Sequence, residues 1–438
     1  MRFPRSNRKT WLLAGALVVV AIAIAAYAIH ELGKPGNSNN NSVAFQNTTT
    51  TTTTTSTTPA KARVNNFTIP FYGGQATRTR DFASSSALNN PSSLKLAWTF
   101  GGNALLEFPA TIWGDNLYLL DDSAALKRIK ISNGKQIWKR HMGTCRGCGL
   151  SASTPSLDVA RKELFVTVLS LKGSKIGAVG GELAAVSMSS GKTLWTASVP
   201  SGAESSPMVV GNSVYFGDQA GTEYSLNIRT GHQNWAFSTG GAIKAGAAYY
   251  KDVLYFGNYA GEFYGVNAKT GKAVWSDSPG GEFYSTPAIA YGRVYVGNNN
   301  GAAYSFGLSS GTVAWTRTLG GYVYSGPAVA TIPGLGPTVF IGSYDGDLYA
   351  LNAQDGSVRW SAPVPCSTRP GVSGSAVVVN NTVYASGVYC KGSYGYNART
   401  GARVWSYPDG SYTPVIADQN ALFLMGKYVL YKFDKSGK

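Results

Sequence analysis

The sequence is poor in histidine, cysteine and charged residues, which carry much of enzyme chemistry. Among 438 residues there are three histidines and four cysteines, and charged residues make up 14%. His30, His141 and His232 are too scattered to predict a histidine-based metal site or a Ser–His–Asp triad. No Walker loop, HExxH motif or nucleophile elbow occurs. Catalysis is therefore weakly supported, and we predict no catalytic residue and no metal site.

Long runs of basic residues are also missing, although the formal net charge is +16. Residues 1–34 carry five basic residues and one acidic residue, and the remaining excess is spread thinly along the chain. A nucleic-acid-binding protein normally gathers Lys and Arg on one face or stripe. We therefore predict no nucleic-acid partner and interpret the positive charge of the body as solvated surface charge.

One long apolar run exists, at residues 11–28 (WLLAGALVVVAIAIAAYA). It is about long enough to cross a hydrocarbon core as a helix, and basic residues precede it. The sequence therefore predicts a cytoplasmic basic tail at 1–10, a single transmembrane anchor at 11–30 and an extracytoplasmic body in the cell envelope. The alternative is a cleaved signal peptide with its site near Ala26–Ala28, which would make the body a secreted protein. No cysteine lies near this segment, which excludes a lipid-anchored lipoprotein.

A low-complexity stretch follows the apolar run. Residues 36–42 read GNSNNNS, and residues 48–55 are eight consecutive threonines. Such a composition cannot bury enough apolar surface to fold. We interpret residues 31–91 as a Thr-rich stalk, with O-glycosylation left open.

Eight of the ten tryptophans recur with a regular spacing. Successive members lie 40, 57, 40, 40, 40, 45 and 45 residues apart, and seven of them have glycine four positions earlier. The series is Trp98, Trp138, Trp195, Trp235, Trp275, Trp315, Trp360 and Trp405. Such a period with Gly and Trp marks is typical of β-propeller blades. The glycine supplies the positive φ of a tight turn, and we expect the tryptophan to pack between neighbouring blades.

Each repeat predicts four short antiparallel strands joined by tight turns. The strand at 94–100 has no preceding blade, whereas the chain ends after three strands with a turn at 434–437. The strand at 94–100 would therefore complete the last blade and leave no free edge. We predict an all-β fold, an eight-bladed β-propeller of four-stranded antiparallel blades over residues 92–438, working as a monomer.

Several copies of the repeat resemble those of a known family. The segments at 225–235, 265–275, 350–360 and 395–405 (SLNIRTGHQNW, GVNAKTGKAVW, ALNAQDGSVRW and GYNARTGARVW) are similar to the repeat of pyrroloquinoline-quinone-type (PQQ-like) propellers. Weaker copies lie at 128–138, 185–195 and 305–315, so the resemblance covers the whole of residues 92–438. The family includes PQQ-dependent alcohol and glucose dehydrogenases, and also cofactor-free scaffolds such as the propeller lipoprotein of the outer-membrane β-barrel assembly machinery.

The resemblance points to the cofactor-free branch. Large alcohol dehydrogenases of this family typically carry two adjacent cysteines and a calcium site of Glu, Asn and Asp. This chain has no Cys-Cys pair and no obvious calcium cluster. We therefore expect neither PQQ nor Ca²⁺. The predicted anchor and stalk also differ from the lipid anchor of the assembly lipoprotein, which weakens any parallel in cellular role.

The four cysteines suggest two disulfides, because an exported body can form them. Cys366 falls in the loop that enters one blade, and Cys390 falls near the turn between the second and third strands of the same blade. In a propeller these connections lie on one face, so we predict a Cys366–Cys390 bridge. Cys145 and Cys148 lie in an insertion of the second blade, and we predict a local disulfide between them, without redox function.

The remaining candidate site is the mouth of the ring. Positions three before the proline of each inner strand, or its equivalent, should form one circle on the loop-bearing face: Leu106, Ala152, Glu204, Lys244, Tyr284, Tyr324, Val372 and Ser411. Glu204 and Lys244 belong to adjacent blades and are expected to pair. Tyr284, Tyr322 and Tyr324 would offer an aromatic platform for a partner. The alternative is that these residues only fill and solvate the funnel.

Three functions remain open at this stage. The first is a non-enzymatic scaffold that binds an envelope protein or peptide through the ring-face loops. The second is a PQQ-dependent dehydrogenase of alcohols or sugars. The third is a receptor for envelope polysaccharide, which the tyrosine content and the basic body favour.

Overall fold

The structure is a computed structural model that describes residues 43, 45–46, 67–102, 104–143, 150–169, 180–366, 371–387, 390, 392–410, 412 and 415–437. The predicted tail and membrane anchor, at 1–30, lie outside these residues. Within the described part of the chain, no helix is both long and apolar enough to cross a bilayer.

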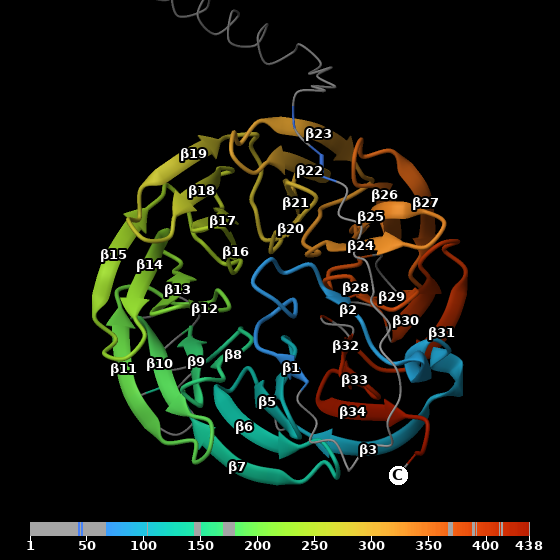
Figure 1. The fold of residues 1–438 in the computed structure, drawn as a ribbon, viewed down its shortest axis with the longest axis horizontal. Coiled ribbons are helices and arrows are strands. Elements are labelled where there is room, and N and C mark those ends of the chain that lie inside the picture. Colours follow the sequence, from blue (N-terminus) through green and yellow to red (C-terminus); the bar gives the residue numbers. More distant parts are fainter. Residues whose placement is uncertain are drawn as a thin grey trace, which may run out of the picture. The chain divides into compact units, whose positions relative to one another are not determined.

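Eight antiparallel sheets are arranged around one axis (Figure 1). Blade 1 contains β4 (Thr111–Trp113), β5 (Asn116–Leu120), β6 (Ala125–Lys130) and β7 (Gln136–His141). Blade 2 contains β8 (Ser156–Asp158), β9 (Glu163–Val168), β10 (Gly181–Ser187) and β11 (Thr193–Val199). Blade 3 contains β12 (Met208–Val210), β13 (Ser213–Gly217), β14 (Thr222–Asn227) and β15 (Gln233–Ser238). Blade 4 contains β16 (Ala248–Tyr250), β17 (Val253–Gly257), β18 (Phe263–Asn267) and β19 (Ala273–Asp277).

The second half of the ring repeats the pattern. Blade 5 contains β20 (Ala288–Ala290), β21 (Arg293–Gly297), β22 (Ala302–Gly307) and β23 (Val313–Thr318). Blade 6 contains β24 (Ala328–Ile332), β25 (Gly336–Gly342), β26 (Asp347–Asn352) and β27 (Val358–Pro363). Blade 7 contains β28 (Val377–Val379), β29 (Thr382–Ser386), β30 (Ser393–Asn397) and β31 (Arg403–Tyr407). Blade 8 contains β32 (Val415–Ala417), β33 (Leu422–Met425), β34 (Val429–Asp434) and β3 (Lys95–Gly101).

The predicted closure is confirmed. Strand β3, which holds Trp98, pairs antiparallel with β34, with Leu96 opposite Phe433 and Phe100 opposite Leu430. The N-terminal strand therefore supplies the outer strand of the C-terminal blade. This pairing ties the two ends of the ring together and removes the free edge of blade 8.

The tryptophans join neighbouring blades, as the spacing predicts. A Cβ on Gly311, in the last turn of blade 5, would lie 2.5 Å from the ring of Trp275 in blade 4. The Trp275 indole also donates a hydrogen bond (2.8 Å) to the carbonyl oxygen of Leu308 in blade 5. Gly311 has φ +69°, so glycine meets two demands here, a left-handed turn and close contact with an indole ring. The same Trp-over-Gly contact recurs at Gly134, Gly191, Gly231, Gly271, Gly356 and Gly401.

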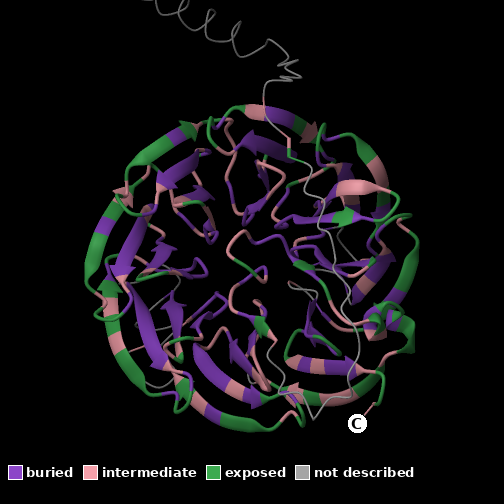
Figure 2. Cartoon of the chain, in the orientation of Figure 1, coloured by how far each residue is buried: buried purple, intermediate pink, exposed green. Residues whose placement is uncertain are grey.

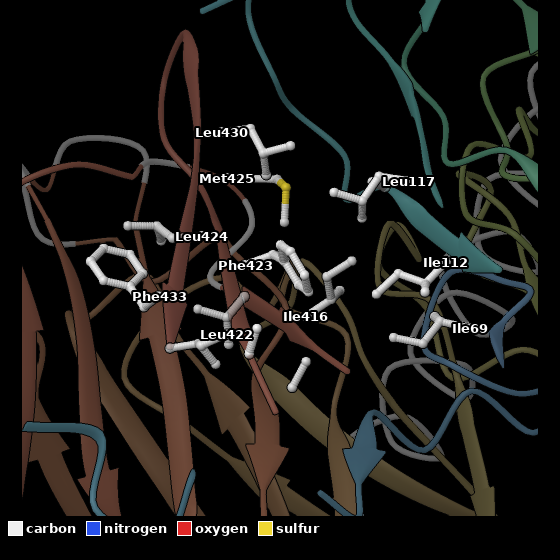
Figure 3. Close-up of a cluster of buried hydrophobic side chains, with 14 of the residues drawn as sticks. Ile69, Ile112, Leu117, Ile416, Leu422, Phe423, Leu424, Met425, Leu430 and Phe433 are labelled. Carbon is white, nitrogen blue, oxygen red and sulfur yellow. The ribbon is translucent and has the colours of Figure 1, made fainter. Parts of the chain in front are cut away.

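Burial decreases from the axis outward (Figure 2). The three inner strands of a blade are almost wholly buried, whereas the outer strands alternate, as in β19 with only Trp275 buried. A hydrophobic cluster bridges blade 8 and blade 1, the two blades at the closure. It includes Ile112, Leu117, Ile416 and Phe423 (Figure 3). The closure is therefore packed as well as hydrogen-bonded.

The expected start of the propeller at residue 92 needs correction. Residues 67–91 were assigned to the stalk, but the structure places them on the ring. They contain β1 (Thr68–Ile69), β2 (Asp81–Phe82) and two short 3₁₀ helices, η1 (Ser86–Leu88) and η2 (Pro91–Ser93). Strand β1 adds antiparallel to β4, and β2 adds parallel to β28, so blades 1 and 7 have five strands.

Residues 67–85 follow the inner edge of the ring. Their carbonyl oxygens accept hydrogen bonds from backbone N–H groups of one inner strand after another, those of Leu157, Tyr249, Ile289, Val329 and Val378. These strands belong to blades 2, 4, 5, 6 and 7. The segment therefore provides hydrogen-bond acceptors for backbone N–H groups of the innermost strands that would otherwise point unpaired into the channel. We call residues 67–85 the channel segment; in Figure 1 it is the blue ribbon in the centre.

Candidate functional site

Two arginines of the channel segment form the centre of the ring. Arg78 is fully buried, and its guanidinium donates to the carbonyl oxygens of Ala247 (2.5 Å), Tyr72 (2.9 Å) and Ser206 (3.1 Å). Ser206 and Ala247 precede the inner strands of blades 3 and 4. The pKa of Arg78 falls to about 9, because burial penalises its charge and Arg80 lies close by. The planar guanidinium thus donates hydrogen bonds to several carbonyl groups that converge on the axis of the ring.

Arg80 donates hydrogen bonds to carbonyl groups on the opposite side of the channel. It donates to the carbonyl oxygens of Pro327 (2.9 Å) and Thr286 (3.3 Å), which precede the inner strands of blades 6 and 5. Its guanidinium lies 4.8 Å from the centre of the Tyr72 ring, a cation–π distance. The Tyr72 hydroxyl is hydrogen-bonded to Ser375 of blade 7. Tyr72, Arg78 and Arg80 therefore close the channel.

Above this closure, a small cavity of about 50 Å³ opens at the mouth of the ring. Its walls include Tyr72, Glu107, Lys244, Tyr284 and Tyr324. Burial raises the pKa of Glu107 to about 7, with a further contribution from the charge of Glu204. A cavity of this size has room for a few water molecules.

The predicted pair of Glu204 and Lys244 is present. Lys244 Nζ lies 3.6 Å from Glu204 Oε2, and the Tyr284 hydroxyl donates to Glu204 Oε1 at 2.9 Å. Gln219 donates to Glu204 Oε2 at 2.9 Å, and Lys244 Nζ stands 4.8 Å from the centre of the Tyr259 ring. Burial raises the pKa of Tyr284, and the negative charge of Glu204 adds to that effect. Charge and hydrogen-bonding groups are therefore largely satisfied inside the network.

The tyrosines continue outward as a contiguous row. The ring centres of Tyr284 and Tyr324 lie 5.3 Å apart, and those of Tyr324 and Tyr344 lie 5.0 Å apart in an edge-to-face arrangement. Tyr322 contacts both Tyr324 (6.2 Å) and Tyr344 (6.3 Å). The Tyr322 side chain is 56% exposed, whereas Tyr284 and Tyr324 are partly buried. We call Tyr284, Tyr322, Tyr324 and Tyr344 the tyrosine rim.

The tyrosine rim borders a surface groove of about 390 Å³ between blades 5 and 6. Tyr322 and Tyr344 form one part of its lining, and Asn299, Asn300 and Leu319 form another. The loops between second and third strands (298–301 and 343–346) and the loop from blade 5 to blade 6 (319–327) supply these residues. All of them lie on the face that carries the mouth of the ring.

Not every predicted rim position reaches the surface. Leu106 and Val372 are fully buried, and Ala152 is nearly so, because these positions face the packed interior of their loops. Ser411 lies outside the described residues. Five further residues of the mouth were not predicted from the sequence: Tyr72, Glu107, Gln219, Tyr259 and Tyr344. Tyr259 and Tyr344 occupy the same turn position in blades 4 and 6, so alignment of the repeats was a usable signal for those two.

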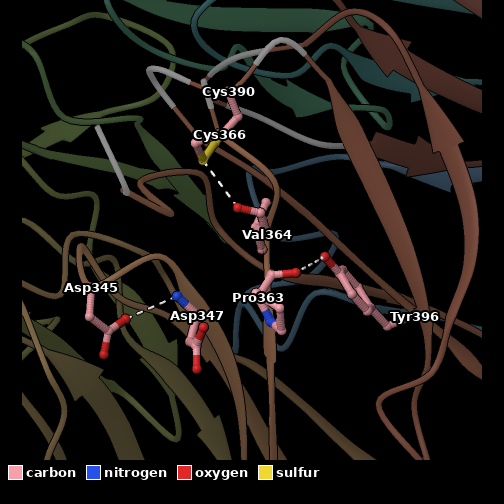
Figure 4. Close-up of a disulfide and its surroundings, with 7 residues drawn as sticks. All are labelled: Asp345, Asp347, Pro363, Val364, Cys366, Cys390 and Tyr396. Atoms are coloured by element: carbon pink, nitrogen blue, oxygen red, sulfur yellow. Dashed lines mark hydrogen bonds between the residues drawn. A yellow bond between two sulfur atoms is a disulfide. The ribbon is translucent and has the colours of Figure 1, made fainter. Parts of the chain in front are cut away.

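The predicted Cys366–Cys390 disulfide is confirmed. It links the loop after β27 to the turn between β29 and β30, on the face of the tyrosine rim (Figure 4). Nearby, the Tyr396 hydroxyl donates to the carbonyl oxygen of Pro363 at 2.8 Å and holds the end of β27. Cys145 and Cys148 lie outside the described residues. Within the described ranges, no three His, Cys, Asp or Glu side chains gather as a metal site would require.

Comparison with known proteins gives a family and a fold. A family model described as "Outer membrane protein assembly factor BamB" matches residues 122–245 and 224–437. None of the curated proteins matches the sequence.

Solved structures share the architecture at low identity. BamB from Moraxella catarrhalis superposes with a TM-score of 0.63 at 15% identity, over 78% of this chain and 99% of that one. A quinohemoprotein alcohol dehydrogenase from Comamonas testosteroni gives 0.66 at 14% identity, over 85% of this chain and 81% of that one. The computationally designed Ika8 protein gives 0.62 at 12% identity, over 78% and 99%. At such identities the likeness concerns the fold alone.

The cavity at the mouth of the ring does not fit PQQ, the cofactor of the dehydrogenases that the repeat resembles. Cofactor pockets usually enclose about 300–1,000 Å³, whereas this cavity measures about 50 Å³ and Tyr72 closes its floor. A tricarboxylate such as PQQ needs free cationic groups. Lys244 is paired with Glu204, and the guanidiniums of Arg78 and Arg80 bind backbone carbonyls. The described residues at the mouth therefore leave a cavity too small for this cofactor, and the cationic groups beside it already have partners.

Proposed function

This chain belongs to the family described as outer membrane protein assembly factor BamB, and from that premise we propose that it is a protein-binding scaffold. The observation that carries the proposal is the tyrosine rim beside its groove. The rim places an exposed Tyr322 on a base of packed tyrosines, next to a groove of about 390 Å³. The closed channel leaves this face as the part of the molecule best suited to recognition.

The chemistry of the rim suits a protein or peptide partner. Tyrosine provides a large amphipathic contact area with few rotatable bonds, so it loses little conformational entropy on binding. The contacts of Tyr322 with Tyr324 and Tyr344 already restrict its ring before a partner arrives. Asn299 and Asn300 border the same groove and add amide groups that can recognise a partner's backbone. We expect an apolar or aromatic side chain of the partner to enter the groove.

Site-specific photo-crosslinking tests the proposal. A photoreactive amino acid replaces Tyr322 in one variant and Val274 in another, and cells that express each protein are irradiated. Val274 is a matched control, because its side chain is 49% exposed but lies on the outer strand of blade 4. We expect discrete protein adducts at position 322 that disappear with Tyr344→Ala. The same adducts at both positions, or none at position 322, would contradict the proposal.

A receptor for envelope polysaccharide is the second candidate. The stacked tyrosines and the two asparagine amides in the groove favour it, since aromatic faces and amide groups are also suitable contacts for sugars. Binding on a glycan array that is lost in Tyr322→Ala and kept in Val274→Ala would support this alternative. Silence across all glycans would reject it.

We also propose that the propeller is extracytoplasmic and tethered by residues 11–30. The Cys366–Cys390 disulfide supports export, because such bonds persist in oxidising compartments. Protease added to intact spheroplasts should digest the propeller and leave the N-terminal tail intact. Protection of the propeller would contradict this location.

A further inference from the structure

A short piece of the predicted stalk lies against blade 5. The Gln46 N–H donates to the carbonyl oxygen of Tyr291 at 3.0 Å, and Arg293 Nη2 donates to the carbonyl oxygen of Val43 at 3.0 Å. The Phe45 ring lies 5.3 Å from the Tyr291 ring and 5.3 Å from the Arg293 guanidinium. Val43 and Phe45 both pack against the hydrophobic cluster between blades 5 and 6.

Blade 5 departs from the repeat where this segment lies. Gly307 occupies a position held by Asn227, Asn267 and Asn397 in blades 3, 4 and 7. In blade 4, the Asn267 side chain accepts hydrogen bonds from the next turn (3.0 Å from both Lys269 N and Thr270 N). A Cβ at position 307 would stand 2.8 Å from Ser310 Oγ in the same turn and 3.0 Å from Val43 Cγ1, so both side chains would have to shift. The glycine therefore contributes to the space that Val43 occupies.

The strand partner of Gly307 is also unusual. It is Arg293, whereas the equivalent residue is Ser213 in blade 3 and Val253 in blade 4. Arg293 is only 5% exposed, and its guanidinium joins Val43 to the carbonyl oxygen of Gln354 (2.6 Å) in blade 6. Burial of a charged side chain is tolerated when its N–H groups form hydrogen bonds. Here one of those donors binds the stalk segment.

The first turn of blade 5 presents an aromatic side chain to the segment. Tyr291 has φ +53°, a left-handed conformation that is unfavourable for a bulky residue. The equivalent residue is Gly211 in blade 3, and it also has positive φ in blades 4 and 7, at Lys251 and Asn380. The aromatic ring at 291 contacts Phe45, so blade 5 places a side chain in this turn that the segment uses. Two departures from the repeat and this aromatic contact therefore converge on one short peptide.

We propose that Val43, Phe45 and Gln46 belong to an intramolecular docking motif, and that the surface formed by Tyr291, Arg293 and Gly307 (the docking surface) is its specific binding site. The docking surface recognises a peptide with apolar side chains at two alternate positions, Val43 and Phe45. The Tyr291 carbonyl and the Arg293 guanidinium read the peptide backbone. The motif stands in the sequence as an apolar island, SVAFQ, between an Asn-rich stretch and a Thr-rich stretch.

Docking changes the effective length of the tether. If the anchor at 11–30 spans the membrane, the link between membrane and propeller is residues 31–42 in place of 31–66. The docking surface is formed by first-to-second and third-to-fourth strand turns, whereas the tyrosine rim lies on the opposite face of the ring. The docked tether therefore leaves the rim unobstructed.

A weak site is sufficient for this purpose. A short linker gives an effective concentration in the mM range, so a site with a dissociation constant of about 1 mM would already be substantially occupied in cis. A free peptide in trans would need mM concentrations to compete. The arrangement therefore favours the protein's own segment over a diffusing one.

Disulfide trapping in the full chain tests the proposal. Val43→Cys and Gly307→Cys are combined, the protein is mildly oxidised, and trypsin then cuts the linker at Lys61 or Arg63. We expect the N-terminal fragment to stay attached to the propeller until a reductant is added. Val43→Cys with Asn267→Cys, the same turn position in blade 4, is the matched control and should release the fragment. Equal linkage in both pairs, no linkage in the first, or disulfide-linked dimers would overturn the proposal.

A second pair of variants separates docking from folding. Adding Phe45→Ala to the trapping pair should slow disulfide formation at least tenfold, whereas adding Ser42→Ala should not. Gly307→Asn introduces the residue that blades 3, 4, 6 and 7 have at this position, and it should expel Val43 without unfolding the ring. We expect exchange of the Gln46 amide hydrogen to rise at least tenfold in this variant, with strand amides unchanged. Unchanged exchange at Gln46 would contradict the assigned role of Gly307.

Discussion

The two arginines in the channel invite a direct test, replacement of Arg78 by methionine. Methionine keeps much of the aliphatic volume but removes the charge and every donor. The change leaves three buried carbonyl groups, those of Tyr72, Ser206 and Ala247, without their guanidinium partner. Because two of these carbonyls belong to different blades, the variant tests whether the arginine stabilises the ring as a whole.

The magnitude follows from two opposing effects. A hydrogen bond to a charged group contributes about 2 kcal/mol, so three such bonds amount to about 6 kcal/mol. Burial of the guanidinium is unfavourable, as its lowered pKa shows, and removing it returns about 3 kcal/mol. We therefore expect Arg78→Met to lower the free energy of unfolding by about 3 kcal/mol. For a ring of about 370 residues, this corresponds to a fall in Tm of about 4 °C.

Thermal unfolding of the full-length protein, followed by calorimetry, measures the effect. Arg399→Met is the control, because Arg399 is exposed at a turn of blade 7 and should change the stability by less than about 0.5 kcal/mol. Equal Tm values for wild type and Arg78→Met would refute the reasoning. They would show that desolvation of the guanidinium cancels its hydrogen bonds.

Three further predictions concern the body of the propeller. Burial raises the pKa of Glu223 from 4.5 to about 8, so the folded state holds this proton more tightly than the unfolded state does. The stability that this gives is lost as pH rises from about 4.5 to about 8. Glu223→Gln should therefore raise Tm at pH 8 but not at pH 4.5. Gly271→Ala places a Cβ 2.7 Å from a tryptophan ring and should lower the free energy of unfolding in urea by about 3 kcal/mol. Gly211 also has positive φ but has open space around it, so Gly211→Ala should lower it by only about 1 kcal/mol. Equal losses would refute the contact between blades. Replacing Cys366 and Cys390 by serine should cost about 3 kcal/mol, from a sequence separation of 24 residues, and should remove the effect of reductant on Tm unless Cys145 and Cys148 also respond.

The repeat made the ring predictable. Each of the seven Gly–Trp contacts joins consecutive blades, and the eight periodic tryptophans, one in each outer strand, give the number of blades. The position of Trp98 before the first full unit revealed the closure with β34. The Cys366–Cys390 bridge followed from the same register, because the register assigns each loop to a face. These inferences depend on local patterns that recur, which a single sequence displays directly.

The channel segment could not be predicted in this way. Residues 67–85 have no repeat of their own, and each hydrogen bond they form reaches a different blade. Their strands β1 and β2 are two residues long, too short for a period to appear. Arg78 and Arg80 resemble ordinary surface arginines in the sequence, and only the ring around them explains their burial. Such long-range complementarity is a property of the assembled fold.

The departures from the repeat, more than the repeat itself, indicate where this propeller acts. Positions that build the ring must look alike from blade to blade, because each meets the same neighbours. Tyr322 differs from Ala242 and Glu282, its counterparts in the two preceding loops, on one face, and Arg293 and Gly307 differ on the other. Tyr322 follows blade 5, and the other two residues lie within it. One region of the ring thus carries an exposed aromatic surface on the mouth face and the docking surface on the opposite face. Tether release by Gly307→Asn should therefore leave crosslinking at Tyr322 intact, and coupled loss of both would show that the two faces communicate through this region of the ring.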